Sequence, residues 1–338
     1  MDARHRHKIA KSMAGVSAVL SGVLLGSCYP PLDCGYLAWI ALAPLGLGIT
    51  SKGLDRGAWC GVYAGGLIYH LMSLEWMRTA YGGESMFGPY ATGWAAAGHA
   101  ATVIFLVVFM VSRKVIVHYS LPLCVGLPLF WGALDTTRKV VSECFGGEAI
   151  PWFSLGVTQV DRTSIIQVAD LGGEGLIGLL IAGANGLLFD LLRQIVGKGW
   201  SGQLTGWRLA SPACVAAFLL AAFAYSKLRE GQEPATDGPV IQLVGKHETL
   251  LKPTPTDPTV DLVIWPELSA NPRILTQCDS SVGDPLGVAA GREQLRQAAA
   301  SRGASLLVGC ERVDYQPENP RYYNSLILAS IGTERVEW

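Results

Sequence analysis

The stretch Asp261-Leu262-Val263-Ile264-Trp265-Pro266-Glu267 sets a short apolar run directly before a proline and a carboxylate. A run of this length is typical of a buried β-strand, and the proline ends the strand because it has no backbone N–H to donate. Upstream, long apolar runs dominate residues 12–226. The chain is therefore predicted to join a membrane part to an α/β domain.

Composition agrees with this division. Half of the 338 residues are hydrophobic, only 16% are charged and the mean hydropathy is +0.32, which is too apolar for two ordinary soluble domains. The net charge of -1 gives no reason to expect a nucleic-acid partner. The eight cysteines show no C-x-x-C spacing, so neither a metal site nor a dense disulfide framework is predicted, and no cofactor is expected.

Seven segments are apolar enough to cross a bilayer, which takes about 20 helical residues. They lie at residues 12–29, 35–50, 57–77, 89–112, 115–134, 171–192 and 208–226. The first two are short and the second contains Pro44, so a broken hairpin is the alternative to two full spans. The fold class predicted for this part is an α-helical membrane bundle of about seven spans.

Three polar residues in or beside these segments, His70, Glu75 and His99, need an explanation because polar groups are costly in a bilayer. They have interfacial or packing roles, or they line a cavity for a polar lipid head group. Small residues at 61–66 and 95–98 predict close helix packing. A long outer loop, residues 136–170, carries Trp152, which suits a membrane interface and a lateral entrance for lipid.

Basic residues in the short loops predict the orientation, because they resist translocation. With the N-terminus inside, eleven lie on the cytoplasmic side: Arg4, Arg6, Lys8, Lys11, Lys52, Arg56, Arg113, Lys114, Arg193, Lys198 and Arg208. Four lie on the other side: Arg78, Arg138, Lys139 and Arg162. The start also looks like a signal peptide, but no A-x-A site follows Ser27. Seven crossings would deliver residues 227–338 to the outer side.

The outer part reads as strand, helix, strand. After the predicted membrane domain (1–226) and a linker (227–239), strands are expected at 240–244, 260–265, 305–309 and 323–330, with a helix at 287–302. Sites in such α/β folds gather at the carboxyl ends of strands. Glu267 stands at such an end beside the apolar wall of Trp265, where it could act as a general base. An ordinary solvent-exposed glutamate is the alternative.

The motif at 262–267, an apolar run followed by Trp-Pro-Glu, resembles the carbon-nitrogen hydrolase (nitrilase) superfamily. With a multi-span N-terminal body, the chain resembles the apolipoprotein N-acyltransferase family. Further motifs that resemble this family, in order, are Tyr29-Pro30-Pro31-Leu32-Asp33; Leu129-Phe130-Trp131 with Asp135 and Arg138; Pro151-Trp152, Leu155-Gly156 and Gln159; and Tyr322-Tyr323-Asn324-Ser325.

The resemblance implies that residues 240–338 begin an αββα nitrilase-like domain with a Glu-Lys-Cys triad. Glu267 maps onto the general base, and Trp152, Trp265, Tyr323 and Asn324 are predicted to bind substrate. It also implies a bacterial inner-membrane enzyme of lipoprotein biosynthesis. A membrane phospholipid would donate an acyl chain to a cysteine thioester, and the N-terminal cysteine amine of a diacylglyceryl-apolipoprotein would accept it.

Several features depart from the family pattern. The chain reaches Trp338 before the expected lysine and cysteine, so the domain is expected to be incomplete and residues 1–338 inactive alone. The segment 245–259 is short, and Val244 replaces a family glutamine. Cys310 does not fit as the nucleophile, because no lysine lies between it and Glu267. The alternatives are a non-catalytic membrane protein that binds lipid or lipoprotein, and a membrane-anchored amidase.

Overall fold

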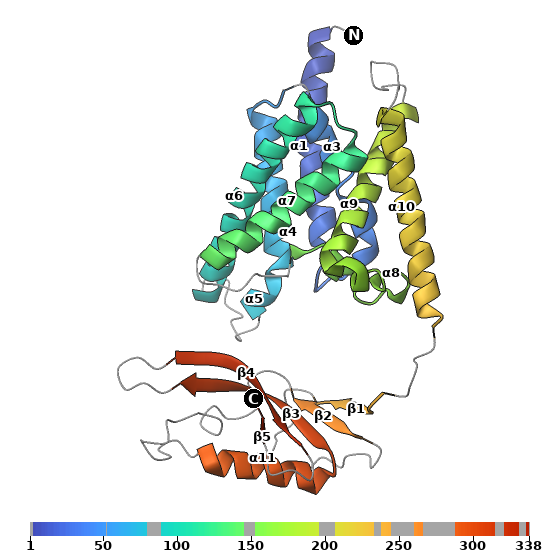
Figure 1. Ribbon diagram of the computed structural model, residues 1–338. Coiled ribbons are helices and arrows are strands. Elements are labelled where there is room, and N and C mark those ends of the chain that lie inside the picture. The colour runs from blue at the N-terminus through green and yellow to red at the C-terminus, as the bar shows by residue number, and fades with distance from the viewer. Residues whose placement is uncertain are drawn as a thin grey trace. The chain divides into compact units, whose positions relative to one another are not determined.

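The computed structural model describes residues 3–51, 53–79, 89–144, 153–195, 207–232, 238–244, 260–265, 288–314, 321–330 and 336–337. The chain divides into two compact units, Met1–Gln232 and Glu233–Trp338. The first unit is helical, and the second is built on a β-sheet (Figure 1).

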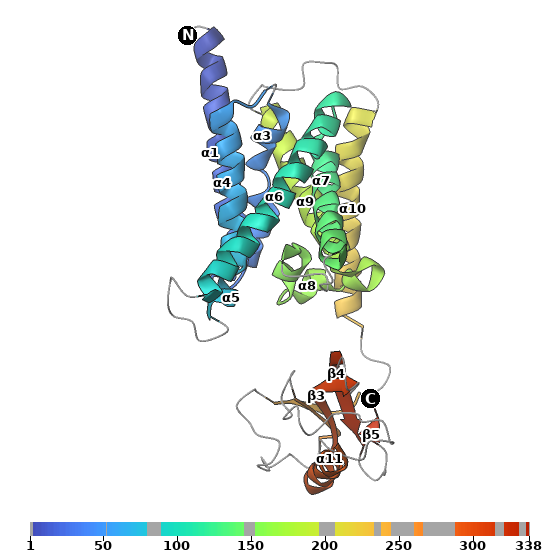
Figure 2. The ribbon, with the colours of Figure 1, turned by 90° about the vertical axis from the view of Figure 1, so that its left-hand side faces the viewer.

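The helical unit is a bundle whose long helices run side by side in two perpendicular views (Figures 1 and 2). In chain order its elements are α1 (Ala3–Gly26), the 3₁₀ turn η1 (Gly35–Leu37), α2 (Ala38–Ala41), α3 (Leu45–Thr50), α4 (Arg56–Ser73), α5 (Glu75–Thr79), α6 (Pro89–His118), α7 (Leu123–Cys144), the 3₁₀ turn η3 (Gly156–Gln159), α8 (Thr163–Ile166), α9 (Ala169–Ile195) and α10 (Trp207–Glu230).

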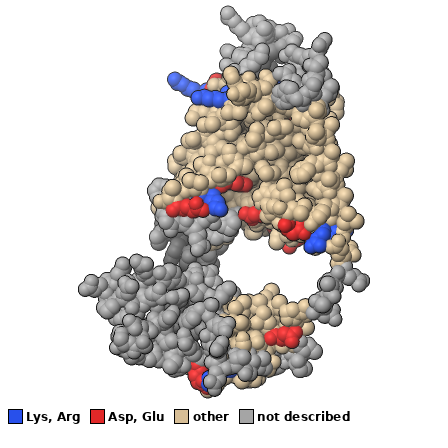
Figure 3. Space-filling view, in the orientation of Figure 1, with Lys and Arg blue, Asp and Glu red and all other residues tan. Residues whose placement is uncertain are grey.

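The bundle has the features of a membrane body. In the described residues, three helical stretches are long and apolar enough to span a bilayer, Ala91–His118, Ala169–Ile195 and Ala210–Glu230. Two shorter apolar stretches are Ser12–Gly26 and Gly35–Thr50. On the face seen in Figure 3, charged side chains lie near the two ends of this unit and a broad band between them carries none. Membrane helices are thus confirmed, while the number seven stays a prediction.

The predicted second segment is broken into η1, α2 and α3, as in the broken-hairpin alternative. Pro44 precedes α3 and has no N–H to continue the helix. Asn185 of α9 supports the break: its Oδ1 accepts the N–H groups of Leu42 (2.8 Å) and Ala43 (3.0 Å), and its Nδ2 donates to the carbonyl oxygen of Ala38 (2.8 Å). The buried amide of Asn185 therefore gives hydrogen-bond partners to backbone groups of the segment in which the helix is broken.

Three predicted boundaries were wrong. Helix α6 continues to His118, and the chain turns at Ser120, which has a φ of 51°, before α7 begins. Helix α7 then runs to Cys144, so residues 136–144 are helical and are not part of an outer loop. Helix α10 ends at Glu230, so the start of the predicted linker is also helical. Each error followed from ending a helix where its apolar run ends, whereas backbone hydrogen bonding continues through polar residues.

Glycines allow α1 and α4 to pack closely, as the small-residue pattern predicted. A Cβ added to Gly65 would lie 2.2 Å from the carbonyl oxygen of Ala18, and one added to Gly22 would lie 2.0 Å from that of Gly65. Both contacts are with backbone, which cannot move aside without separating the helices. Small residues are thus required where these two helices cross.

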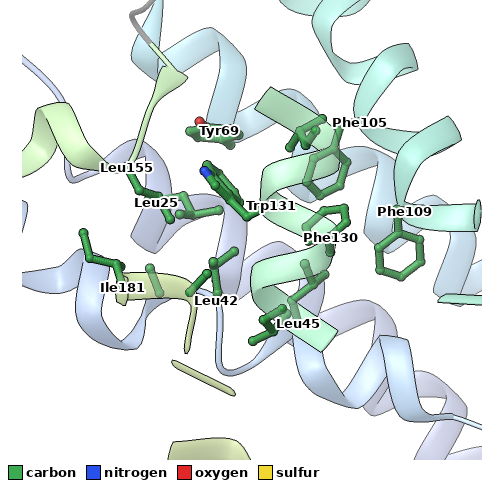
Figure 4. Packing of buried hydrophobic residues seen from close by; sticks show 14 of the residues in the cluster. Leu25, Leu42, Leu45, Tyr69, Phe105, Phe109, Phe130, Trp131, Leu155 and Ile181 are labelled. Atoms are coloured by element: carbon green, nitrogen blue, oxygen red, sulfur yellow. The ribbon is translucent and has the colours of Figure 1, made fainter. Parts of the chain in front are cut away.

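A cluster of aromatic side chains fills the centre of the bundle. Tyr69, Phe109, Phe130 and Trp131 are completely buried, and Phe105 is nearly so. Figure 4 shows Trp131 between Tyr69 and the aliphatic side chains of neighbouring helices. The Phe105 and Phe130 rings meet edge to face with centroids 5.5 Å apart, a favourable geometry for aromatic pairs.

The second unit contains one mixed sheet and one helix in its described part. Its elements are β1 (Ile241–Leu243), β2 (Leu262–Trp265), α11 (Val288–Arg302), β3 (Ser305–Asp314), β4 (Arg321–Ala329) and β5 (Val336–Glu337). The strand order is β1-β2-β3-β4-β5, with the first three strands parallel and the pairs β3–β4 and β4–β5 antiparallel. The four predicted strands and the predicted helix are confirmed, with β3 longer than expected. The second sheet of an αββα sandwich stays a prediction.

Candidate functional site

The carboxyl end of β2 is the place where the sequence predicts catalysis. Trp265 is the last residue of β2 and pairs with Val308 of the parallel strand β3. Glu267, two residues further on, lies outside the described residues, as does Trp152. The structure therefore describes the strand that leads to this site. Strand β2 is paired with β1 on one side and β3 on the other, and it ends two residues before Glu267.

Trp265 belongs to the hydrophobic core of the second unit. It is 2% exposed and shares this core with Leu295 of α11 and Leu306 of β3. The guanidinium of Arg302 lies 4.9 Å from its ring centroid, within cation–π distance. Its buried Nε1–H has no hydrogen-bond partner among the described residues. Trp265 thus fixes the end of β2 against α11, and its contact with substrate stays a prediction.

Tyr323 and Asn324 lie on β4. Their pairing with β3 places their backbone at the edge of the sheet where β2 ends. Strand β3 continues past the end of β2 to Asp314, and this extension pairs Glu311 with Asn324 and Arg312 with Tyr323. The backbone of both predicted substrate-binding residues is therefore carried beyond the carboxyl end of β2. Because the first three strands are parallel, that edge is also where their carboxyl ends meet.

A second group of polar residues lies inside the helical unit around Arg138 of α7. The side chain of Arg138 is 9% exposed; its Nη1 lies 3.4 Å from Oδ1 of Asp135, and its Nη2 lies 2.8 Å from Nε2 of His70 on α4. The guanidinium carbon lies 4.9 Å from the ring centroid of Phe153 and 5.7 Å from that of Tyr69. We call these five residues the Arg138 cluster. Aromatic faces and the carboxylate of Asp135 thus surround a charge that would be costly in lipid.

His70 is held in one tautomer by its neighbours. An arginine only donates, so Nε2 of His70 accepts from Arg138 and the ring proton is on Nδ1. Nδ1 lies 2.7 Å from the carbonyl oxygen of Gly66 and 3.1 Å from Oγ1 of Thr102, which itself donates to Gly98. The neutral ring thus links α4, α6 and α7. His70 is completely buried, so the prediction that it reaches lipid head groups was wrong and the packing role holds.

The other polar residues singled out in the spans lie elsewhere. Nδ1 of His99 is 2.7 Å from the hydroxyl of Tyr63, and His99 is exposed. Glu75 is the first residue of α5. His70 and His99 therefore have separate partners. In the described part of the chain, no three His, Cys, Asp or Glu side chains come together in a way that could hold a metal ion.

Two tyrosines fix the segment that follows Trp152. Tyr69 donates to the carbonyl oxygen of Phe153 (2.9 Å), and Tyr29 donates to that of Ser154 (3.1 Å). Both tyrosines are buried. The sequence analysis picked out Asp135 and Arg138 as motif residues and His70 as a costly polar residue. It placed Arg138 in an outer loop, whereas α7 continues to Cys144, and so it missed that these residues form one cluster.

Comparisons with known proteins identify relatives of the chain. Residues 21–187 match the family described as the apolipoprotein N-acyltransferase N-terminal domain. The apolipoprotein N-acyltransferase of Geobacter metallireducens is 28% identical over 275 residues, which cover 75% of this chain and 50% of the relative. That of Rhodopirellula baltica is 26% identical over 317 residues, which cover 83% and 53%. That of Gloeobacter violaceus is 28% identical over 222 residues, which cover 60% and 38%.

The extent of these matches matters for both units. The chain spans about half the length of the curated relatives that it matches best. The family match includes the Arg138 cluster and ends within α9. A similarity that covers 83% of the chain is longer than the whole first unit, Met1–Gln232, so it extends into the second unit.

Proposed function

We propose that this chain, whose residues 21–187 belong to the apolipoprotein N-acyltransferase N-terminal domain family, is part of an N-acyltransferase of a bacterial inner membrane. Its reaction would move an acyl chain from a phospholipid to the N-terminal cysteine amine of a diacylglyceryl-apolipoprotein. The observation that carries the proposal is a membrane body of this family followed by a buried parallel strand that ends two residues before Glu267.

In the proposed mechanism Glu267 is the general base of a Glu-Lys-Cys triad. It takes the proton from the cysteine thiol, and the thiolate attacks the ester carbonyl of the phospholipid. A C–S bond forms as the ester C–O bond breaks, and the lysophospholipid leaves with the proton. The lysine cation stabilises the oxyanion of each tetrahedral intermediate. The resemblance assigns no lysine or cysteine of residues 1–338 to this triad.

The second half-reaction transfers the acyl group to the lipoprotein. The α-amino group attacks the thioester, a C–N bond forms and the C–S bond breaks, and the amine proton returns through Glu267 to the cysteine. This ping-pong sequence needs a base at a fixed position, and the packing of Trp265 between the sheet and α11 supports such a position for the residues that follow.

The proposed arrangement in the membrane follows the distribution of basic residues. The N-terminus would be cytoplasmic, and residues 240–338 would form the first part of a nitrilase-like domain on the outer side, after the helical unit whose last helix ends at Glu230. The tyrosine contacts to Phe153 and Ser154 support a fixed outer segment from which Trp152 could contact a lipid entering from the side.

The test compares two glutamate variants of the protein as its own cell produces it. Activity is the transfer of a labelled acyl chain from a phospholipid to a peptide with an N-terminal diacylglyceryl-cysteine. Glu267→Gln should lower the rate at least about 100-fold, because it removes a general base. Glu293→Gln is the control, since Glu293 is half exposed on α11 and its partners among the described residues, Arg296 and Gln297, lie on the same helix.

Each outcome is decisive. Equal rates for Glu267→Gln and Glu293→Gln would overturn the assignment of the base. No transfer by the unaltered protein, with lipoprotein still bound, would favour the non-catalytic alternative. Hydrolysis of a soluble amide in place of acyl transfer would favour the amidase.

A further inference from the structure

The last turns of α10 are joined to the neighbouring helices by polar side chains, although most of this helix is exposed. Only 6% of the most apolar window of Ala210–Glu230 is buried, against 56% of that of Ala169–Ile195 in α9. Leu220 and Leu228 are both exposed. In a bilayer such side chains contact lipid tails as readily as protein, so they give little drive for α10 to dock. Polar contacts at its end therefore matter for its position.

One set of contacts centres on Asp170 at the start of α9. The hydroxyl of Tyr225 donates to this carboxylate, at 3.0 Å from Oδ1 and 2.9 Å from Oδ2, and Nε of Arg229 lies 3.2 Å from the same Oδ2. Asp170 lies before a non-helical point at Gly172 and Gly173. Two side chains one turn apart on α10 thus share one carboxylate on the short turn that leads into α9.

A second set joins α10 to α8, the short helix beside it in both views (Figures 1 and 2). Oγ1 of Thr163 donates to Oε1 of Glu230 at 2.8 Å, and Oγ of the buried Ser226 donates to the carbonyl oxygen of Ile165 at 3.3 Å. A single exposed ion pair contributes little, but a network of shared carboxylates contributes more. We call the five side chains whose contacts with a carboxylate join α10 to α8 and α9 the α10 latch: Thr163, Asp170, Tyr225, Arg229 and Glu230.

The segment that receives α10 is itself fixed to the bundle. Nε2 of Gln159 donates to the carbonyl oxygen of Gly35 at 2.8 Å, and its Oε1 accepts from Nε1 of Trp39 at 3.1 Å. The two tyrosines described above hold the start of the same segment. Residues 153–170 therefore form one support, to which the end of α10 is attached.

Helix α10 is also the last helix before the second unit. The chain leaves it at Glu230 and enters β1 at Ile241, so residues 231–240 connect the two. Ten residues span at most about 35 Å. If the last turns came free from Tyr225 onward, the connection would be about 1.6 times as long, and the effective concentration of one unit at the other would fall about twofold, because it falls with about the −3/2 power of length.

We propose, on the basis of the acyl transfer proposed above, that the α10 latch positions the second unit by fixing the point from which that unit is tethered to the helical unit. The members of the latch are positioning residues, and they take no part in the reaction itself. Opening the latch raises the KM for phospholipid and leaves kcat unchanged. It alters how often the site in the second unit meets a lipid at the membrane body, and not the groups that carry out the transfer.

Two cations in the last turns of α10 allow a matched test. Arg229→Gln breaks the contact with Asp170, whereas Lys227→Gln removes the same charge from a residue whose partner among the described residues is Glu230 of α10 itself. Hydrogen exchange of the amides of residues 225–232 is measured on the purified protein in detergent. Arg229→Gln should speed this exchange by about threefold to fivefold, and Lys227→Gln should leave it unchanged.

The KM for phospholipid is then measured with the same variants in the acyl-transfer assay. Arg229→Gln should raise it about twofold relative to Lys227→Gln, with kcat unchanged. Inserting about six Gly and Ser residues between Ala235 and Thr236 of the unaltered protein should raise KM equally without changing the exchange of residues 225–232, because it lengthens the connection and leaves the latch intact.

Equal exchange in Arg229→Gln and Lys227→Gln would overturn the proposal, because the latch would then not hold the end of α10. Faster exchange in Arg229→Gln with an unchanged KM would overturn the positioning role. An unaltered protein that transfers no acyl chain would overturn the proposed function and with it the positioning role, while the exchange rates would still show whether the latch holds α10.

Discussion

Replacing Asn185 by leucine should loosen the attachment of α2 to α9. The side chain is completely buried and makes four hydrogen bonds. Three of them cross to the broken segment, through the N–H groups of Leu42 and Ala43 and the carbonyl oxygen of Ala38. Leucine has a similar size but neither donates nor accepts.

The expected loss follows from these three contacts. Side-chain hydrogen bonds between membrane helices contribute about 0.6 kcal/mol each on average, which gives about 2 kcal/mol for three. In water-soluble proteins, each buried donor or acceptor left unpaired costs about 1–3 kcal/mol, which would give a larger loss of stability. The lower figure is appropriate because Ala43 N–H also has the carbonyl oxygen of Ile40 at 3.2 Å. At about 2–4 °C per kcal/mol for a unit of this size, the melting temperature should fall by about 4–8 °C.

The measurement is the thermal loss of helical circular dichroism of the purified protein in detergent. Thr136→Val is the control, because the hydroxyl of Thr136 is exposed and donates only to the carbonyl of Gly132 in its own helix. This variant should melt within about 1 °C of the unaltered protein. If Asn185→Leu melts as Thr136→Val does, the amide does not hold the broken segment and the explanation of the break is wrong.

Two further variants test the packing of the bundle by the same measurement. Gly65→Ala should lower the melting temperature, because its Cβ would meet the backbone of α1 at 2.2 Å. Gly57→Ala should not, because its Cβ would meet only Oδ1 of Asp55, at an ordinary contact distance of 3.6 Å; equal effects would contradict the close approach of α1 and α4. Arg138→Met should cost about 3 kcal/mol, because it strands the partly buried carboxylate of Asp135. Adding Asp135→Asn should recover part of that loss, and a double variant as unstable as the sum of the single ones would refute the pairing.

Much of the second unit was predictable because strands are local patterns. The apolar run before Trp265 and the one after Ser305 are short, and each is bounded by residues that end a strand. The structure pairs them as parallel neighbours, which is the arrangement that a strand–helix–strand order favours. The extension of β3 to Asp314 was not predicted. Its residues are polar, so no apolar pattern marks them as a strand, and it is their pairing with β4 that holds them in the sheet.

The candidate sites divide in the same way. Glu267 could be singled out from sequence because a Trp-Pro-Glu end is a contiguous motif. The Arg138 cluster could not, because the bond from Arg138 to His70 joins residues 68 positions apart. The sequence flagged His70 as a costly polar residue, but its partner was identified only by the crossing of α4 and α7.

Sequence alone determined which segments are apolar enough for a membrane and which are strands, because hydrophobicity and period are properties of a few neighbouring residues. Tertiary structure decided where the apolar segment 35–50 is interrupted and which distant residues contact it. Asn185 supports Ala38 from 147 positions away, and Leu24, Ile40 and Leu192, which come from three separate helices, line one groove. Such features depend on how helices approach one another, and a local pattern holds no information about distant partners.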